Sequence, residues 1–246
     1  MKIVAVVSGK GGVGKTFVTC NAGVILALAG FKTIVIDADV DLANIELVYG
    51  VEAKATLQDL VDGSAKPSDV VHEGPAGVMV VPAGIRLKRR VRASEFDSAV
   101  SKVIEAVDAE FVLIDAPAGL DAQVVTCLQM SDEYVLVAVP EVTSIVDAYK
   151  VKQVADSVSR QLGVVLNRVG RLMLTKRRIE NTLGTVIAAI PEDSKVKDSI
   201  DSGIPYVLKR SGGIVVRELF KFASRIAGIE IEPKKKGLLS SLFKGK

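Results

Sequence analysis

Tryptophan is absent from this chain of 246 residues, and aromatic side chains make up only 4% of it. The hydrophobic 49% must therefore be mainly Val, Ile, Leu and Ala, which is typical of parallel strands covered on both faces by helices. The two cysteines, Cys20 and Cys127, have no partner at metal-ligand spacing, and we expect both to be buried, reduced thiols. We expect the one histidine, His72, at a surface or edge position without a catalytic role.

Long apolar runs are also missing, which excludes a membrane-spanning helix. The short apolar start is followed by glycines in place of a cleavage site, so we expect a cytoplasmic protein rather than a secreted one. Positive charge is unevenly placed, because residues 233–246 hold five lysines and no acid. The preceding 232 residues carry 27 basic and 29 acidic side chains, so the body has a slight negative excess.

Apolar, strand-like runs alternate with helix-like segments along most of the chain. This alternation predicts a single-domain α/β fold with a mainly parallel sheet of about seven or eight strands and helices on both faces. We expect one domain over 1–230, followed by a tail over 231–246. The predicted strands are 2–7, 32–37, 78–81, 111–116, 134–140, 163–167 and 184–191. The predicted helices are 15–29, 41–49, 94–108, 121–130, 144–160, 175–183, 194–202 and 214–227.

The stretch GKGGVGKT, residues 9–16, lies between the first predicted strand and the first predicted helix and matches G-x-x-x-x-G-K-[ST]. Glycines in such a loop let backbone N–H groups point inward at phosphate oxygens, and the helix that follows adds its positive end. We expect Lys15 to reach the β- and γ-phosphates of a nucleotide and the Thr16 hydroxyl to bind Mg²⁺. The remaining loop residues predicted to bind the nucleotide are Gly9, Gly11, Gly12, Val13 and Gly14.

A second lysine, Lys10, lies in the same loop, although Lys15 and the glycine N–H groups already surround the phosphates. The segment KGGVGKT resembles the deviant Walker A motif of the MinD/ParA ATPases. The resemblance implies that Lys10 crosses a dimer interface and contacts the partner's ATP, so that ATP is both substrate and dimer contact. The family usually has a second Thr or Ser after Thr16, where this chain has Phe17; the lost polar contact is worth about 1 kcal/mol.

Two apolar runs end in carboxylates. Asp37 ends one run and Asp39 follows it, a spacing at which two carboxylates can flank a metal–phosphate centre. Asp115 ends the other, as expected for an acid that holds Mg²⁺ through water. The resemblance implies that Asp37 lies near the Mg²⁺ shell, that Asp39 orients the attacking water, and that Asn44 belongs to the same switch. It also implies that the Gly119 N–H senses the γ-phosphate.

Two later segments extend the resemblance, which runs from residue 2 to about 227. The run VVLNRV, 164–169, ends near Asn167, which in the family faces the adenine, and we include the adjacent Arg168 in the site. The segment 189–207 resembles a loop whose backbone, around Pro191 and Glu192, closes over the base. The cofactors implied are ATP or ADP and Mg²⁺, and the implied activity is slow, partner-stimulated ATP hydrolysis.

The tail ends in GLLSSLFKGK. On a helical wheel one broad face gathers four apolar side chains, and lysines flank both ends, which is the pattern of a short interfacial helix on anionic lipid. One copy would bind only marginally, whereas two copies in an ATP-dependent dimer would bind with avidity. The tail also resembles a MinD membrane-targeting sequence; docking on the domain itself or a plain basic terminus are the alternatives. The predicted membrane-contacting residues are Leu238, Leu239, Leu242 and Phe243.

The resulting hypothesis is a MinD-like ATPase that cycles between cytoplasm and the inner face of the cell membrane, and positions a division or cell-surface apparatus. Its expected partners are a second copy, anionic membrane and an unidentified activator or cargo. A ParA-type DNA-partitioning ATPase is the alternative, supported only by the basic run RLKRRVR, 86–92. A redox carrier of the nitrogenase iron-protein type would need a cysteine pair at the dimer interface, and only Cys127 is available.

Overall fold

A computed structural model describes residues 1–86, 89–170 and 174–233. Eight strands of this described part form one sheet in the order β3-β4-β2-β5-β1-β6-β7-β8. All neighbouring pairs are parallel except β3–β4 at one edge. The strands are β1 (Lys2–Ser8), β2 (Thr33–Asp37), β3 (His72–Glu73), β4 (Met79–Val81), β5 (Phe111–Ala118), β6 (Glu133–Ala138), β7 (Arg160–Val169) and β8 (Val186–Pro191).

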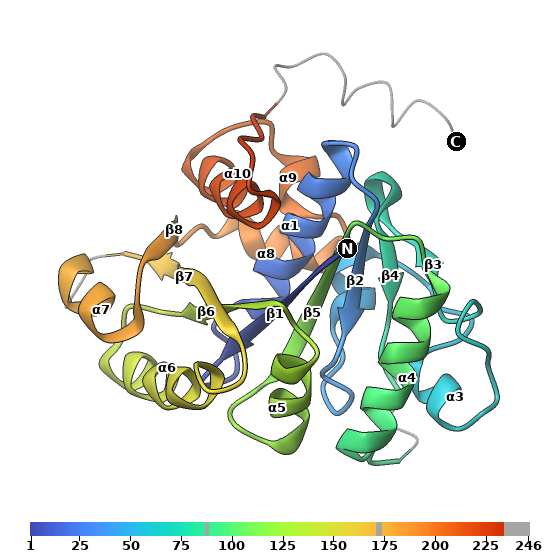
Figure 1. Cartoon of the computed structure of the whole chain (residues 1–246). Coiled ribbons are helices and arrows are strands. Elements are labelled where there is room, and N and C mark those ends of the chain that lie inside the picture. The colour runs from blue at the N-terminus through green and yellow to red at the C-terminus, as the bar shows by residue number, and fades with distance from the viewer. Residues whose placement is uncertain (87–88, 171–173, 234–246) are drawn as a thin grey trace.

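Helices cover both faces of the sheet (Figure 1). One face packs against α1, α2, α9 and α10, and the other against α3 to α7. Alternate residues of β1, β2, β5 and β6 divide between two apolar clusters, as Val4 and Ala5 of β1 do. The helices are α1 (Lys15–Leu28), α2 (Ile45–Tyr49), α3 (Leu57–Val61), α4 (Ala93–Ala106), α5 (Ala122–Gln129), α6 (Val142–Ala155), α7 (Lys176–Leu183), α8 (Lys195–Asp201), α9 (Tyr206–Lys209) and α10 (Ile214–Ala227), with a 3₁₀ turn at Pro75–Gly77.

The predicted fold class is confirmed: this is one α/β domain with a mostly parallel sheet. Cys20 and Cys127 are buried free thiols, as expected. His72 lies on the edge strand β3, where its Nε2 is 2.6 Å from the Ala55 carbonyl oxygen. None of the helices in the described ranges is both long and apolar enough to cross a bilayer.

Two predicted helices are too long. The predicted helix over 41–49 begins only at Ile45, because side-chain carboxylates accept the backbone N–H groups of Leu42, Asn44 and Ile45. The predicted helix over 144–160 ends at Ala155, and the chain turns into β7 at Arg160. The short elements β3, α3 and α9 were not predicted, since segments of two to five residues show no periodicity.

The expected boundary between domain and tail stays a prediction. Residues 228–233 follow α10, and Ile231 packs against the core cluster beneath α1 and α10. The predicted membrane-contacting residues Leu238, Leu239, Leu242 and Phe243 lie outside the described residues.

Candidate functional site

The loop over 9–14 connects β1 to α1 at the carboxyl edge of the parallel strands, where open α/β sheets place their binding sites. Its backbone needs glycine at two points. Gly14 has φ +91°, and a Cβ there would lie 2.1 Å from the Asn167 Nδ2. A Cβ on Gly9 would lie 2.2 Å from the backbone carbonyl carbon of Asp147 in α6. The loop is therefore fixed between α6 on one side and the end of β7 on the other.

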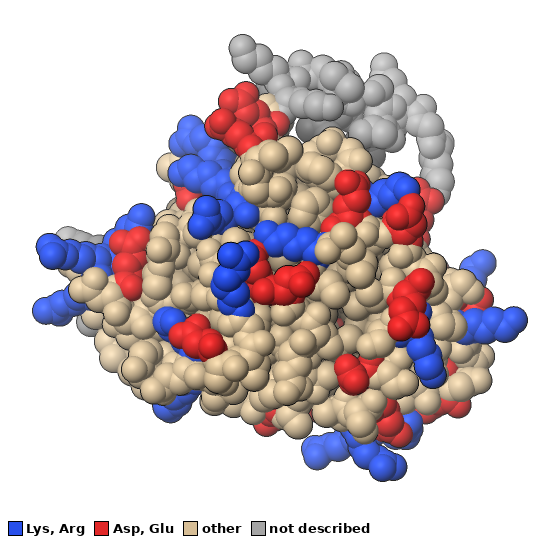
Figure 2. Space-filling view, viewed as in Figure 1, with Lys and Arg blue, Asp and Glu red and all other residues tan. Residues whose placement is uncertain are grey.

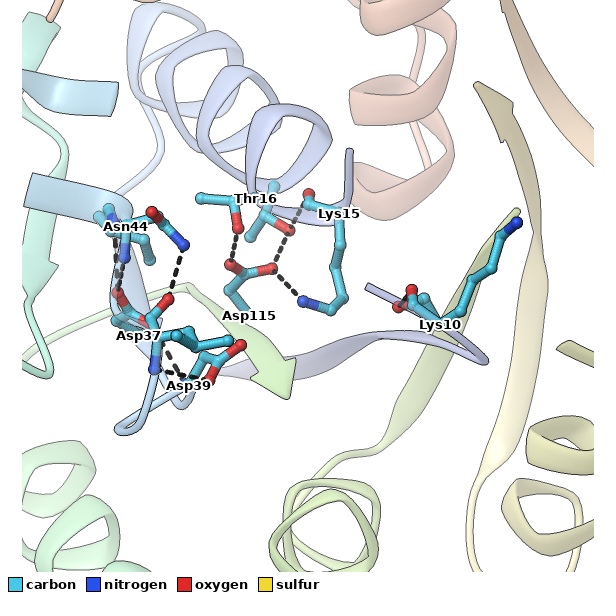
Figure 3. A network of polar contacts seen from close by, with 11 residues as sticks. Lys10, Lys15, Thr16, Asp37, Asp39, Asn44 and Asp115 are labelled. Carbon is cyan, nitrogen blue, oxygen red and sulfur yellow. Dashed lines mark hydrogen bonds and ion pairs between the residues drawn. The ribbon is translucent and has the colours of Figure 1, made fainter. Parts of the chain in front are cut away.

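Lys15, Thr16 and Asp115 meet at the start of α1 (Figure 3). The Thr16 hydroxyl donates to Asp115 Oδ2 at 2.6 Å, and Lys15 Nζ lies 3.7 Å from Asp115 Oδ1. Thr19, one turn further along α1, also donates to Asp115, at 3.2 Å. Asp115 and Lys15 are both buried, so this charge pair lies in a low dielectric and is strongly coupled.

Asp37 ends β2 beside Asp115 of β5, with which it is in register. Its carboxylate accepts the backbone N–H groups of Asp39, Asn44 and Ile45, each at 3.1 Å. Burial, and then the negative charge of Asp115, raise the pKa of Asp37 to about 8 despite these bonds. One lysine cannot balance two adjacent buried carboxylates, so Asp37 holds its proton at neutral pH unless a cation is bound.

A divalent cation fits this donor set. Two carboxylates and the Thr16 hydroxyl are the oxygen ligands that Mg²⁺ prefers, and a cation would relieve the repulsion that raises the Asp37 pKa. Within the described ranges no group of three or more His, Cys, Asp and Glu side chains is arranged to hold a metal alone. Phosphate oxygens and water would supply the remaining ligands, as in nucleotide-dependent magnesium sites.

Asp39 follows Asp37 and faces the same edge. Its carboxylate accepts the Leu42 N–H at 3.1 Å. Burial raises its pKa, opposed by the charge of Lys15. Asn44 donates its side-chain amide to the Leu42 carbonyl at 2.6 Å, so its side chain stabilises the turn before α2. The predicted switch segment is therefore assembled around Asp37 and Asp39.

Lys10 points away from this cluster (Figure 3). Its Nζ lies 3.0 Å from Glu141 Oε2 and 3.5 Å from Thr143 Oγ1, at the beginning of α6. The two lysines of the loop thus face different surroundings: Lys15 is buried beside Asp115, whereas the Lys10–Glu141 pair is exposed to solvent.

A cavity of about 490 Å³ opens beside the loop on the side of β7 and β8. It brings together predicted nucleotide-binding residues from three segments: Gly14, Phe17, Asn167, Arg168, Pro191 and Glu192. Asn167 donates its amide to the Val13 carbonyl at 2.8 Å, which joins the end of β7 to the phosphate loop. Arg168 has φ +53°, a left-handed conformation that is unusual for arginine. The cavity has a size and position suited to the base of a bound nucleotide.

The backbone N–H of Gly119, which we expect to sense the γ-phosphate, has a hydrogen-bond partner within the chain. Its N–H donates to the Ser8 carbonyl at 2.9 Å, so it is already bound in this structure. Its φ of +92° is a left-handed conformation that favours glycine. The predicted contact with a γ-phosphate stays a prediction, and it requires the bond to Ser8 to break.

Several residues around the site were missed by sequence reasoning. Thr19 supports Asp115, Gln123 of α5 donates to the Ala38 carbonyl at 2.8 Å, and Glu141 binds Lys10. The spacing of Thr19 from Thr16 places both on one face of α1, which is a usable signal. The sequence around Gln123 and Glu141 carries no such signal, because their contacts depend on how the loops fold.

A glycine-rich loop between a buried strand and a helix, with an adjoining lysine, threonine and strand-end carboxylates, defines a P-loop nucleotide-binding protein. The model of the CobQ/CobB/MinD/ParA nucleotide-binding domain matches residues 4–206. The chain belongs to this family. The expected cofactors, ATP or ADP and Mg²⁺, agree with the nucleotide-binding character of this family and with the Mg-ADP bound by a solved MinD described below.

Relatives of known name and structure support the assignment. The chain is 34% identical to an uncharacterised ATP-binding protein of Methanocaldococcus jannaschii, over 98% of this chain and 95% of that protein. It is 31% identical to the septum site-determining protein MinD of Pyrococcus horikoshii complexed with Mg-ADP, over 92% and 95%, with a TM-score of 0.79. The Aquifex aeolicus MinC:MinD cell division protein complex matches with 26% identity over 96% and 99%, and a TM-score of 0.82.

Proposed function

We propose that this chain is a MinD-like ATPase that dimerises on ATP, binds membrane through its C-terminal tail and is released by hydrolysis. The position of Lys10 carries the proposal. Lys15 lies beside Asp115, where the phosphates of its own subunit's nucleotide are expected. Lys10 instead extends outward and forms an exposed ion pair with Glu141. An exposed pair of this kind is worth only about 0–1 kcal/mol, so Lys10 is readily released to a partner's nucleotide.

The chemistry follows from the side chains around Asp115. Lys15 and the loop N–H groups would hold the phosphates, and Thr16, Asp37 and Asp115 would supply the protein oxygens for Mg²⁺. When bound, the ion neutralises charge that develops on the phosphate oxygens. Asp39 orients the attacking water from the switch segment after β2. The sequence pattern identifies no arginine that would stabilise the charge of the transition state, so we expect basal hydrolysis to be slow and to depend on a partner that rearranges the switches.

The partner surface extends along α6. Val142, Val146 and Tyr149 are 56, 49 and 42% exposed, although all three are large apolar side chains. Their spacing of four and three residues places them on one face of the helix, which begins beside Glu141 and Lys10. An exposed apolar stripe at this position suits a protein partner, here an activator or a cargo.

Membrane binding rests on the tail sequence and on charge. Leu238, Leu239, Leu242 and Phe243 supply an apolar face, and the flanking lysines suit anionic lipid. We place the ATP-bound dimer on the inner face of the cell membrane and the monomer in the cytoplasm. Because similar chains are named septum site-determining and cell division proteins, positioning of a division apparatus is the proposed role.

DNA partitioning is less well supported. Arg89, in the basic run over 86–92, binds Asp62 at 3.1 Å and Glu95 at 2.9 Å, so its charge is partly neutralised. On the face in Figure 2, basic and acidic side chains are interspersed. Nonspecific DNA binding needs a broad positive surface, which this face does not offer.

The test is co-sedimentation with anionic vesicles, with and without ATP and Mg²⁺, using the intact chain and one truncated after Pro233. ATP should increase vesicle binding of the intact chain only. Equal binding of both forms, or none by the intact chain, would contradict the membrane role. DNA binding is measured in parallel, and ATP-dependent DNA binding by both forms would instead support partitioning.

A further inference from the structure

The wall of the base cavity opposite the phosphate loop is formed by α8. Gly14 and Phe17 line the cavity from the side of α1. The distance between the first turn of α1 and α8 therefore sets the width of the cavity. Four residues of α8 line it: Val196, Lys197, Ile200 and Asp201.

The start of α8 is built on Asp193. Asp193 Oδ1 accepts the Lys195 N–H at 2.8 Å, and the Asp193 carbonyl accepts the Val196 N–H at 3.0 Å. The N-cap residue, Ser194, makes no side-chain capping bond. The orientation of Asp193 consequently decides where the first turn of α8 lies.

Tyr206, the first residue of α9, connects Asp193 to α1. Its hydroxyl donates to Asp193 Oδ2 at 2.7 Å. Its ring meets Phe17 edge to face, with centroids 6.1 Å apart and an interplanar angle of 82°. Burial, and then the bond to Asp193, raise the pKa of Tyr206 to about 12, so the hydroxyl stays a donor at neutral pH.

A second link holds α9 against α1. The Val207 N–H donates to Asn21 Oδ1 at 3.0 Å, and Asn21 Nδ2 donates to the Phe17 carbonyl at 2.8 Å. Tyr206 is therefore fixed to the phosphate-loop helix through its ring and its neighbour's backbone. The hydroxyl at the far end of the ring reaches across to Asp193 at the start of α8.

We propose that Tyr206 is a positioning residue for the nucleotide base, holding α8 through Asp193 at the separation from Phe17 that accepts the base. The inference rests on nucleotide binding at the proposed site and adds a determinant to it. It also assigns a use to Phe17, which stands where the family resemblance led us to expect a hydroxyl. The aromatic pair fixes the base side of the cavity rather than contacting a phosphate.

The test distinguishes the contribution of the base to nucleotide binding from that of the phosphates. Binding of Mg-ATP and of Mg-tripolyphosphate, which lacks the base, is measured by calorimetry for the wild-type chain and for Tyr206→Phe. The variant keeps the ring against Phe17 and loses only the hydroxyl. We expect ATP to bind about three- to tenfold more weakly, the range for loss of one ordinary hydrogen bond, because the lost bond acts on the base only through the position of α8. Tripolyphosphate binding should change less than about twofold.

Tyr134→Phe is the matched control. Tyr134 is also buried and donates to an aspartate, Asp156, at 2.5 Å, but it does not line the cavity. The Tyr134→Phe variant should therefore show the wild-type ratio of ATP affinity to tripolyphosphate affinity. Asp193→Ala should weaken ATP binding, and adding Tyr206→Phe to it should weaken it no further, because both act through one bond.

The inference would be overturned by unchanged ATP affinity in Tyr206→Phe, by an equal loss for both ligands, or by the same ratio change in Tyr134→Phe. Additive losses in the double variant would also overturn it. Failure of the wild-type chain to bind Mg-ATP would instead contradict the proposed function on which the inference rests.

Discussion

Lys10 and Lys15 belong to one loop but pair with acids on opposite sides of it. Lys15 Nζ lies 3.7 Å from the buried Asp115, whereas Lys10 Nζ lies 3.0 Å from the exposed Glu141, the residue before α6. The loop thus presents one charge inward and one outward. In the proposed dimer, Lys15 would contact the nucleotide of its own subunit and Lys10 the nucleotide of the partner.

Replacing Lys10 tests this division directly. Lys10→Ala should abolish dimerisation with a non-hydrolysable ATP analogue and Mg²⁺, because the variant lacks the outward charge, while ATP binding to the monomer changes little. Analytical ultracentrifugation measures the first and calorimetry the second. Lys32→Ala is the control, since Lys32 is also exposed and paired, with Asp108 at the opposite end of the sheet. A Lys10→Ala dimer of wild-type affinity would contradict the proposal.

Asp39 should matter for turnover and little for binding. Asp39→Asn keeps an oxygen for the Leu42 N–H, so the switch turn should remain folded. Loss of the carboxylate should lower phosphate release by about a hundredfold or more, because positioned acid–base groups contribute at least that much. ATP-dependent dimers should persist and accumulate on vesicles. Phosphate release at the wild-type rate would exclude the assigned role.

Asp37 makes the ligand-free chain sensitive to pH. Its folded pKa of about 8 is above the unfolded value of about 4, so the native state holds the extra proton and stability falls as pH rises through this window. Between pH 6 and pH 8 we expect a loss of about 2 kcal/mol in the free energy of unfolding, measured by urea denaturation.

The same carboxyl group predicts proton release on cofactor binding. Binding of Mg²⁺ and nucleotide near pH 7 should expel the Asp37 proton, which calorimetry in buffers of different ionisation enthalpy detects. Asp37→Ser, which has no carboxyl group, should flatten the stability slope. A slope of opposite sign in the wild-type chain would show that Asp37 is ionised without a cation.

Phe17 is expected to stabilise the fold through its buried ring, which is 3% exposed. Phe17→Thr would introduce the hydroxyl that the family usually has at this position, which is worth about 1 kcal/mol in nucleotide binding. The same change should lower the free energy of unfolding by about 3 kcal/mol, because it leaves a cavity beside Tyr206. Phe17→Leu should cost about half as much. Thermal and urea denaturation of both variants check this order, and a fully stable Phe17→Thr would refute it.

The phosphate loop and the strand-end carboxylates could be predicted because their signals are local. The glycine spacing before Lys15 specifies a backbone shape, and an apolar run ending in Asp115 specifies a place at the carboxyl edge of the sheet. Parallel strands then bring Asp37 beside Asp115 without further information.

The parts that could not be predicted depend on contacts between distant segments. Helix α2 begins later than predicted because Asp37, eight residues earlier, accepts the Ile45 N–H. A hydrogen bond of this kind leaves no sign in the helical periodicity of the sequence. The connection from Phe17 through Tyr206 to Asp193 joins residues far apart in the chain. Only the assembled sheet and helices bring them together, so a sequence pattern shows each residue without its neighbour.

The bond from the Gly119 N–H to the Ser8 carbonyl has an energetic consequence. A terminal phosphate that captures this N–H exchanges one acceptor for another, so the net gain is small compared with forming a bond from an unsatisfied group. Diphosphate and triphosphate forms would then differ by little in free energy at this point. When two hydrogen-bonding arrangements of Gly119 differ so little in free energy, a protein that binds one of them slightly better can shift the equilibrium in either direction.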